Sequence, residues 1–362
     1  MKLNKINIAL LGCGRISSSH IKAIVSEHNR CDLVALCDKS ECNLNKANIF
    51  LKEQYKENKV TNINTELFLE YNLLLKEHKE KRIRIDLIVI CTPSGFHAEQ
   101  SISAAKLGIN VCTEKPMALK VEDGVDMIKT CKNNEVRLFV VKQNRLNPTL
   151  RDLREKVHSN KFGRIGIVSL NVFWQRPQSY YDQANWRGTL DLDGGALMNQ
   201  ASHYVDLLEW IIGPLHSLNA SIATISRKIE SEDTAVLNLK WRDGTLGSMA
   251  VTMITFPKNI EGSITIIGEK GSAKVGGIAL NKYEFYYFQD EINTKQIEDV
   301  NYLPKTVYGS GHYEYYKNIL DTLNGLDNPI CDGESGLSSV KIINAAYKSA
   351  KSSKNIKIDD IY

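Results

Sequence analysis

Three polar residues that could take part in proton transfer or hydrogen bonding follow one another at intervals of four and three positions: Asn199, His203 and Asp206. In a helix, this spacing puts the three side chains on one stripe. An imidazole with an ordinary pKa near ~6.5 can exchange a proton around neutrality, whereas an amide can only form hydrogen bonds. The spacing therefore predicts that His203, a group able to exchange a proton, and Asn199, which can only form hydrogen bonds, face the same way. Asp206 either fixes the imidazole or forms a structural ion pair.

The stretch that carries these residues, 194–213, reads as one helix. Apolar residues recur at helical spacing on another face of it, at Ala201, Val205, Leu208 and Ile212. Glycines 194 and 195 would let the chain approach another group closely before the helix starts. A solvated polar face is the ordinary alternative for such a stripe. The rest of the chain favours a site.

A glycine-rich turn near the N-terminus has the spacing of a dinucleotide-binding loop. The apolar strand 6–11 leads into GCGRIS, a helix follows over about 18–27, and the strand 33–37 ends in Asp38. Gly12 permits the tight turn, Gly14 lets the backbone approach a pyrophosphate, and Asp38 can accept hydrogen bonds from a ribose. A carboxylate repels a 2′-phosphate, so the pattern favours NAD over NADP. The neighbouring residues Arg15 and Ile16 belong to the same predicted cofactor site.

Later strands end in further chemical groups. The strand 86–91 closes in Thr92 and Pro93 and is followed by His97, for which cofactor contact and helix capping are equal alternatives. The strand 110–113 delivers Glu114 and Lys115 before a proline, and the strand 137–141 leads to Gln143. Ligands of parallel sheets bind at the carboxyl ends of the strands, so these residues extend the predicted cofactor site. A surface position is the ordinary alternative for a lysine such as Lys115.

After residue 145 the alternation of strands and helices gives way to a series of strands. A helix over about 148–159 is followed by strands that alternate or join in hairpins, with Asp243-Gly244 as a strong turn signal. We therefore predict an α/β fold with two domains. Residues 1–145 form a Rossmann NAD-binding domain, and residues 146–362 form an α+β domain for substrate binding and oligomerisation, built on a large open, mostly antiparallel sheet. An apolar outer face on that sheet would call for a partner subunit.

Composition narrows the class of protein. A net charge of +4, without a dense basic tract, gives no case for nucleic acid. No apolar run approaches the roughly 20 residues of a membrane span. The 8 cysteines are scattered, without metal-ligand spacing, so we expect no metal site and a reducing, cytoplasmic setting.

The motifs GCGRIS, EKPMAL and GGALMNQASH together resemble the Gfo/Idh/MocA oxidoreductase family over essentially the whole chain. The runs FWQRPQSYYDQANWRGTLDLDGGALMNQASHYVDLLEW and QNRLNP are similar to one branch, the WlbA/WbpB UDP-N-acetyl-D-glucosaminuronate 3-dehydrogenases. The resemblance implies NAD-dependent oxidation at C3″ of that nucleotide sugar, on the route to diacetamido uronic acids of bacterial surface polysaccharide such as the lipopolysaccharide O-antigen. It implies a homo-oligomer, tetramer or dimer. Some relatives recycle NAD with 2-oxoglutarate and others release NADH, and both remain open here.

The resemblance also implies residue roles. Lys115 and His203 would lie near the reacting carbon, with Lys115 holding the hydroxyl and His203 taking or relaying the proton; which of them is the base stays open. Many family members carry Asp where this chain has Asn199, so Asn199 is a positioning member of the predicted catalytic set. Trp186 and Arg187 would contact the cofactor. Substrate groups would meet the side chains of Arg145, Arg176, Tyr180, Tyr181, Asn199, Tyr308 and His312. Core packing is the ordinary alternative for the aromatic residues.

Two other functions fit the same motifs less well. One is a dehydrogenase of a free sugar or polyol, of the inositol dehydrogenase kind. The other is a non-catalytic NAD-binding regulator, which the presence of both Lys115 and His203 disfavours.

Overall fold

A computed structural model describes residues 4–61, 64–289, 300–303 and 311–361. The chain divides into two compact units. The first comprises residues 1–118, 122–141 and 312–337, and the second comprises residues 119–121, 142–311 and 338–362. The sequence-based division placed residues 312–337 in the second domain. Their place in the first unit follows from an antiparallel bridge between Phe139 and Asp332 and a hydrogen bond from the Tyr315 hydroxyl to the carbonyl of Val140.

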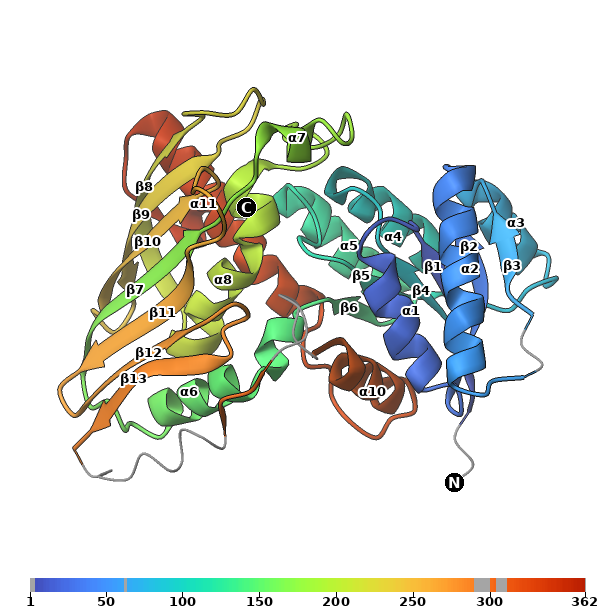
Figure 1. Ribbon diagram of the computed structural model, residues 1–362, viewed down its shortest axis with the longest axis horizontal. Coiled ribbons are helices and arrows are strands. Elements are labelled where there is room, and N and C mark those ends of the chain that lie inside the picture. Colours follow the sequence, from blue (N-terminus) through green and yellow to red (C-terminus); the bar gives the residue numbers. More distant parts are fainter. Residues whose placement is uncertain (1–3, 62–63, 290–299, 304–310, 362) are drawn as a thin grey trace. The chain divides into compact units, whose positions relative to one another are not determined.

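The first unit is built on a parallel sheet with the order β3-β2-β1-β4-β5-β6 (Figure 1). Every pair in it is parallel. The apolar runs of the central strands are fully buried, as expected for a sheet covered on both faces. The strands are β1 (Ile6–Leu11), β2 (Cys31–Cys37), β3 (Glu66–Phe68), β4 (Leu87–Ile90), β5 (Asn110–Thr113) and β6 (Leu138–Val140). The helices are α1 (Ser17–Ser26), α2 (Glu41–Glu57), α3 (Tyr71–Lys79), α4 (His97–Ala105), α5 (Val121–Asn133) and α10 (Gly311–Leu323).

The charged, helix-like pattern of residues 67–81 predicts one long helix, and this prediction is wrong at its start. Leu67 and Phe68 belong to the edge strand β3. Leu67 pairs with Leu36 of β2, and the Phe68 ring is buried. Pairing with β2 and burial of one aromatic ring outweigh the helical pattern, and the helix begins only at Tyr71.

The second unit is built on an eight-stranded sheet with the order β13-β12-β11-β7-β10-β9-β8-β14. All pairs are antiparallel except β7 with β10. The strands are β7 (Ile165–Phe173), β8 (Leu215–Ala223), β9 (Thr234–Trp241), β10 (Leu246–Thr252), β11 (Glu261–Gly268), β12 (Gly271–Gly276), β13 (Lys282–Phe288) and β14 (Ile356–Lys357). The helices are α6 (Pro148–His158), α7 (Gln178–Tyr181), α8 (Ser202–Leu207) and α11 (Gly333–Ser352). This arrangement confirms the predicted α/β fold with a second, mostly antiparallel sheet.

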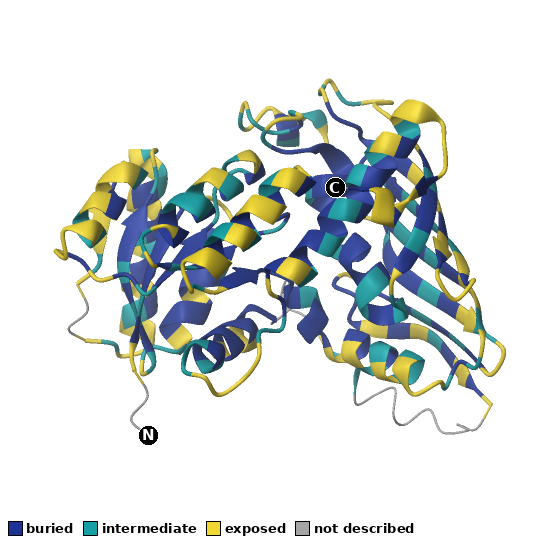
Figure 2. Ribbon diagram, turned by 180° about the vertical axis from the view of Figure 1, so that it is seen from behind, coloured by how far each residue is buried: buried dark blue, intermediate teal, exposed yellow. Residues whose placement is uncertain are grey.

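One face of the large sheet is covered and the other is exposed. Helices α6 and α8 lie on the same side of the sheet in Figure 1. Along β9 the residues alternate between buried and exposed, and Figure 2 shows the same alternation on neighbouring strands. The buried positions of β9, such as Leu237 and Leu239, therefore form the core beneath the helices.

The predicted helix over 194–213 is present with a modified winding. A π-helical turn (Ala196–Gln200) precedes α8, and a second one (Leu208–Ile212) follows it. Each π-helical turn inserts a residue into the helical repeat and so rotates what comes after it. As a result Ile211 is fully buried and Ile212 is only partly so, whereas the sequence pattern placed Ile212 in the core.

Candidate active site

The glycine turn of the first unit has the geometry that a dinucleotide needs. Gly12 has φ +95°, and a Cβ there would lie 2.6 Å from the backbone of Cys91, just after the neighbouring strand β4. A Cβ at Gly14 would meet no described atom within 4 Å. Only glycine fits the first position, and the second leaves the backbone open to a ligand at the start of α1.

Asp38 lies where the ribose of a dinucleotide is expected. One of its carboxylate oxygens accepts a hydrogen bond from the amide of Cys13 at 2.6 Å, and the other accepts from the amide of Ser40 at 2.7 Å. These bonds fix the carboxylate against the glycine turn. Beside the turn, a hollow of about 290 Å³ is lined by residues of α1 and α2 together with Gly14 and Arg15. The residues present therefore fit a nicotinamide dinucleotide.

His97 ties two of the predicted cofactor segments together. Its buried ring places Nδ1 at 2.8 Å from the carbonyl of Pro116 and Nε2 at 2.8 Å from the carbonyl of Thr92. Burial lowers the pKa of His97, which the two carbonyl acceptors oppose. The imidazole thus holds the turn after β4 against the turn after β5.

Lys115 follows a buried carboxylate. Its backbone amide donates to Oε2 of Glu114 at 3.0 Å, and Oε1 of Glu114 accepts from His20 Nε2 at 3.0 Å. Burial by itself would raise the pKa of Glu114, but the bond from His20 and the positive charges nearby hold it well below its usual range. The Lys115 side chain is half-buried beside this anion.

His312, from α10, lies edge-on to His20 with ring centroids 5.2 Å apart. Burial lowers the pKa of His312 to about 4. Ligand atoms of His20, Glu114 and His312 lie within 4.8 Å of one another, close enough to share a metal ion. The direct hydrogen bond between His20 and Glu114 explains their closeness without an ion. The structure thus places His312 in a buried polar cluster; Tyr308 lies outside the described residues.

In the second unit, His203 lies beside Gln143. The Nε2 atoms of the two side chains are 3.2 Å apart. Either orientation of the Gln143 amide gives a hydrogen bond to Nε2 of His203, so this contact fixes the position of the imidazole ring.

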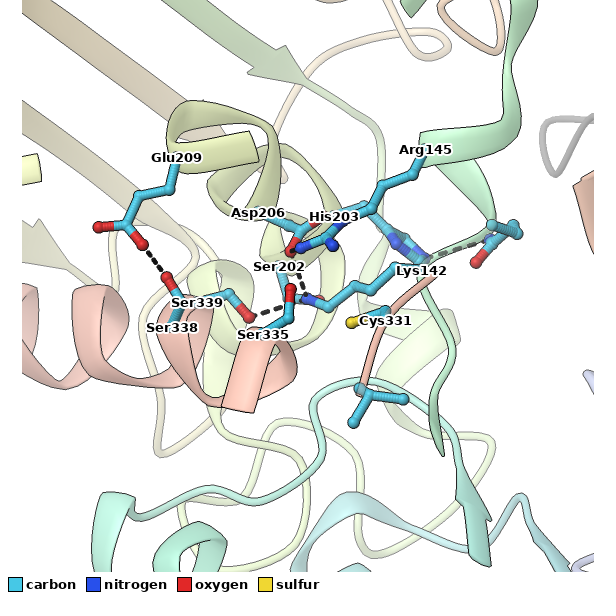
Figure 3. A network of polar contacts seen from close by, with 12 residues as sticks. Lys142, Arg145, Ser202, His203, Asp206, Glu209, Cys331, Ser335, Ser338 and Ser339 are labelled. Atoms are coloured by element: carbon cyan, nitrogen blue, oxygen red, sulfur yellow. Dashed lines mark hydrogen bonds and ion pairs between the residues drawn. The ribbon is translucent and has the colours of Figure 1, made fainter. Parts of the chain in front are cut away.

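Asp206 is the centre of a buried charge cluster (Figure 3). Arg145 donates to it through Nε at 2.8 Å and through Nη2 at 2.7 Å, and Lys142 Nζ lies 3.5 Å from Oδ1. Lys142 also donates to the hydroxyl of Ser339 at 2.8 Å. Burial would raise the pKa of Asp206, but the charges of Lys142 and Arg145 outweigh it and lower that pKa. Asp206 therefore forms an ion pair, and the fork of Arg145 faces a carboxylate of the chain itself.

Asn199 has an acidic neighbour that the sequence analysis did not single out. Its side-chain nitrogen donates to Oδ1 of Asp193, whose other oxygen accepts from the amide of Gly188 at 2.7 Å. Asp193 is 1% exposed. With the nitrogen of Asn199 facing Asp193, the amide oxygen faces the other way.

Cations and rings gather on the segment before α8. The guanidinium of Arg187 lies 4.3 Å from the ring centroid of Tyr180 and 4.8 Å from that of Trp186. Arg176 lies 5.0 Å from the ring of Trp174 and 5.4 Å from that of Tyr180. Tyr181 is buried, which raises the pKa of its hydroxyl. The structure thus gathers Arg176, Arg187, Tyr180 and Trp186 in one half-buried cluster, with Tyr181 packed beneath it.

Sequence reasoning missed His20, Tyr316, Lys142 and Asp193. His20 and Tyr316 are separated from Glu114 by long stretches of chain, so no local pattern connects them. Lys142 directly precedes Gln143, and a lysine just after the last strand of a buried sheet was the available signal for it.

Among the residues described, no helix is both long and apolar enough to cross a membrane. Family models match both halves of the chain. Residues 6–142 match the NAD-binding Rossmann fold of the Gfo/Idh/MocA oxidoreductases, and residues 154–358 match the C-terminal alpha/beta domain of the same family.

Solved structures of similar sequence cover nearly the whole chain. The WlbA dehydrogenase of Bordetella pertussis, in complex with NADH and UDP-GlcNAcA, is 45% identical over 98% of both chains, with a TM-score of 0.89. The WlbA dehydrogenase of Chromobacterium violaceum, with the same ligands, is 43% identical over 99% of this chain and 97% of that one, with a TM-score of 0.87. The myo-inositol 2-dehydrogenase of Thermotoga maritima is 21% identical over 76% of this chain and 81% of its own length.

Proposed function

The chain belongs to the Gfo/Idh/MocA family of oxidoreductases, and on that premise we propose that it oxidises the C3″ hydroxyl of UDP-N-acetyl-D-glucosaminuronic acid to a ketone with NAD⁺. The observation that carries the proposal is identity of 45% and 43%, over almost the full chain, to two dehydrogenases solved with NADH and UDP-GlcNAcA. Bound NAD⁺ supplies the acceptor for the hydride that leaves the carbinol carbon.

The chain supplies the groups that handle the hydroxyl and its proton. Lys115 donates to the hydroxyl oxygen and stabilises the negative charge that develops there as the proton leaves. His203, whose ring is held by Gln143, takes that proton. Asn199, whose nitrogen is held by Asp193, offers its oxygen as an acceptor and so orients the substrate.

The substrate is anionic, and cations near the cluster before α8 suit it. Arg176 and Arg187 lie on rings rather than in carboxylate forks, so their N–H groups remain suited to a diphosphate or a uronate. Arg145 is a weaker choice for this role than the sequence suggested, because Asp206 already engages its fork.

The proposal is tested by adding UDP-N-acetyl-D-glucosaminuronic acid and NAD⁺ to the purified protein and following NADH by absorbance. We expect turnover with this substrate and none with myo-inositol. Lys115→Ala and His203→Ala should each lower kcat by at least about 100-fold. Lys106→Ala and His158→Ala, which remove exposed residues of the same types, serve as matched controls. Oxidation of myo-inositol in preference to the nucleotide sugar would favour a polyol dehydrogenase instead.

We also propose that the exposed face of the eight-stranded sheet is covered by a second copy of the chain. Leu246, Ile167 and Ile267 lie side by side in register on β10, β7 and β11 and are exposed by 55%, 48% and 37%. An apolar row of this kind favours a homo-oligomer, dimer or tetramer. Light scattering should give the mass of an oligomer, and Ile167→Glu should lower it. A monomeric wild-type protein would exclude this arrangement.

Two finer points of the function rest on the similarity to the WlbA dehydrogenases. We propose a cytoplasmic reaction on the route to a diacetamido uronic acid of a surface polysaccharide such as the O-antigen. Recycling of the cofactor by 2-oxoglutarate is tested with a substoichiometric amount of NAD⁺: multiple turnovers that depend on 2-oxoglutarate support recycling, and a single release of NADH excludes it.

A further inference from the structure

A buried chain of hydrogen bonds within the first unit ends at the amide of Lys115. The hydroxyl of Tyr316 lies 2.8 Å from His20 Nδ1, His20 Nε2 lies 3.0 Å from Glu114 Oε1, and Glu114 Oε2 accepts from the Lys115 amide at 3.0 Å. His20 and Tyr316 are 0% exposed, and Glu114 is 7% exposed. The members come from α1, α10 and the end of β5.

The direction of the hydrogen bond between His20 and Glu114 follows from the chemistry of the two groups. A carboxylate oxygen only accepts, so His20 must carry a proton on Nε2. Burial raises the pKa of Tyr316 well above its ordinary value, so its hydroxyl keeps its proton beside Nδ1 of His20. The imidazole therefore joins the Tyr316 hydroxyl on one side to the Glu114 carboxylate on the other.

This arrangement keeps the Glu114 carboxylate negatively charged, although burial favours its neutral form. A carboxylate buried among apolar strands is normally driven toward its neutral form. In this cluster the bond from His20 is the foremost opposing influence on the Glu114 pKa. The other titratable groups that sense the Glu114 charge are Lys115 on the same segment, His312 and Tyr316 on α10, His97 on α4, and Cys91 and Cys112 in the sheet.

We infer that His20 is a positioning residue of the dehydrogenase reaction, which acts on Lys115 by keeping the Glu114 carboxylate ionised and fixed in orientation. The inference rests on the proposed function of Lys115. Without the donor on His20, Glu114 takes up a proton nearer neutrality, the anion beside Lys115 disappears, and the ammonium group loses a stabilising charge. The loss is reversed by raising the pH, because alkaline solution removes the added proton.

The test compares His20→Leu, which removes the donor, with His20→Gln, whose amide nitrogen can still reach Glu114. In His20→Leu, kcat should fall about tenfold relative to wild type near pH 6. The ratio of the variant kcat to the wild-type kcat should rise again toward one as the pH approaches 8. The KM values for both substrates should stay within about threefold, because the inferred effect falls on the chemical step. His20→Gln should restore most of the activity near pH 6. A loss equal at every pH, or no loss, would overturn the inference.

Three further variants separate positioning from folding. Glu114→Gln removes the titrating group, so its kcat relative to wild type should not vary with pH. Tyr316→Phe removes only the hydroxyl behind His20 and should shift the profile in the same direction by less than His20→Leu. Thr322→Val deletes another buried hydroxyl of α10, for which the described residues offer no partner, and should leave the profile unchanged.

A second readout does not require turnover. Infrared difference spectra of His20→Leu should show the carbonyl stretch of a protonated carboxyl group near neutrality, and the band should vanish when Glu114→Gln is added. If wild type fails to oxidise the nucleotide sugar but this band appears, the proposed function falls and the coupling of His20 to Glu114 stands. If His20→Leu gives the same spectrum as wild type, the inference is wrong. One equivalent of a transition metal in the purified protein would also overturn it, since the cluster would then be a metal site.

Discussion

Arg145 holds Asp206 with two nitrogens, Nε at 2.8 Å and Nη2 at 2.7 Å, at a place where the side chains of both residues are less than a tenth exposed. Lys142, whose ammonium group lies 3.5 Å from Oδ1, adds a second positive charge. Asp206 lies one helical turn after His203, so the cluster anchors the segment that carries the proposed base.

Asp206→Asn preserves the shape of the side chain and removes its charge. Two buried cations then lack their counter-ion, so we expect a loss of about 3–5 kcal/mol in the free energy of unfolding. Urea denaturation followed by tryptophan fluorescence measures it. Asp359→Asn, which breaks the exposed pair with Arg242, should cost less than about 1 kcal/mol.

The same ion pair makes stability depend on pH. Folding lowers the pKa of Asp206, so its contribution is complete above the unfolded value of ~3.9 and is lost as the pH falls through the folded value. The difference in the free energy of unfolding between wild type and Asp206→Asn should therefore become smaller at acidic pH. Equal stability of the two proteins at neutral pH would contradict the assignment.

The part of the site that sequence could predict is the part that local spacing defines. Gly12, Gly14 and Asp38 lie near the ends of two adjacent strands, and the spacing of the glycine turn and the following acid pointed to them. The partners of Glu114 could not be found in this way, because His20 and Tyr316 come from helices distant in the chain. No pattern of local spacing predicts which buried polar groups will meet.

The helix over 194–213 shows a second limit. Its existence followed from the apolar spacing, but its π-helical turns did not, and they exchange the burial of Ile211 and Ile212. The partners of its polar residues also lie outside it, Arg145 before the helix and Asp193 just ahead of its glycines. The sequence thus predicted the polar stripe but not what each member of it contacts.

Glu232 is a buried carboxyl group that should make the protein less stable at alkaline pH. Burial raises its pKa to about 7, although the amide of Leu197 and the hydroxyl of Tyr347 donate to it. The unfolded chain releases this proton near ~4.3, so wild-type stability should fall between that pH and about 7 and then level off. Glu232→Gln should be more stable than wild type by about 1–3 kcal/mol at pH 8 and equal to it near pH 4. Thermal unfolding across this range checks the prediction, and a less stable variant at pH 8 would refute it.

Gly195 begins the π-helical turn that carries Asn199, and an alanine there should be poorly tolerated. Its φ is +88°, and an added Cβ would collide with the carboxylate of Glu232. Gly244, in the hairpin between β9 and β10, has a similar φ of +93° with no described atom within 4 Å of an added Cβ. Gly244→Ala should therefore cost about 1 kcal/mol from backbone strain alone, and Gly195→Ala clearly more. Similar unfolding midpoints for the two variants would show that the collision is relieved.

Asp38 should determine the choice between the two dinucleotides. Its carboxylate, fixed by the amides of Cys13 and Ser40, carries the charge that repels a 2′-phosphate. Asp38→Ser should raise the ratio of kcat/KM for NADP⁺ to that for NAD⁺ by about 10- to 100-fold, and the exposed Lys39 next to it can only assist. Steady-state kinetics with both cofactors measure the ratio. An unchanged ratio would mean that the ribose binds elsewhere.

Asn199→Asp restores the acid that many family members have at this position, and in this chain it should impair the enzyme. The new carboxylate would face Asp193, which is buried and accepts from Gly188, so two like charges would share one site. One of them must then hold a proton, and we expect kcat near pH 8 to fall at least about tenfold, with recovery toward acid. The profile of kcat against pH measures this.

Adding Asp193→Asn to Asn199→Asp restores a hydrogen-bonded pair, in which the amide at position 193 donates to the carboxylate at position 199. The double variant should therefore recover activity near pH 8 relative to Asn199→Asp alone, which a double-mutant cycle expresses as a coupling energy. Asn199→Ala, which brings no second charge, should lose activity to a similar extent at every pH. If Asn199→Asp were as active as wild type near pH 8, Asp193 would not determine the orientation of Asn199, and the proposed role of the amide oxygen would have to be abandoned.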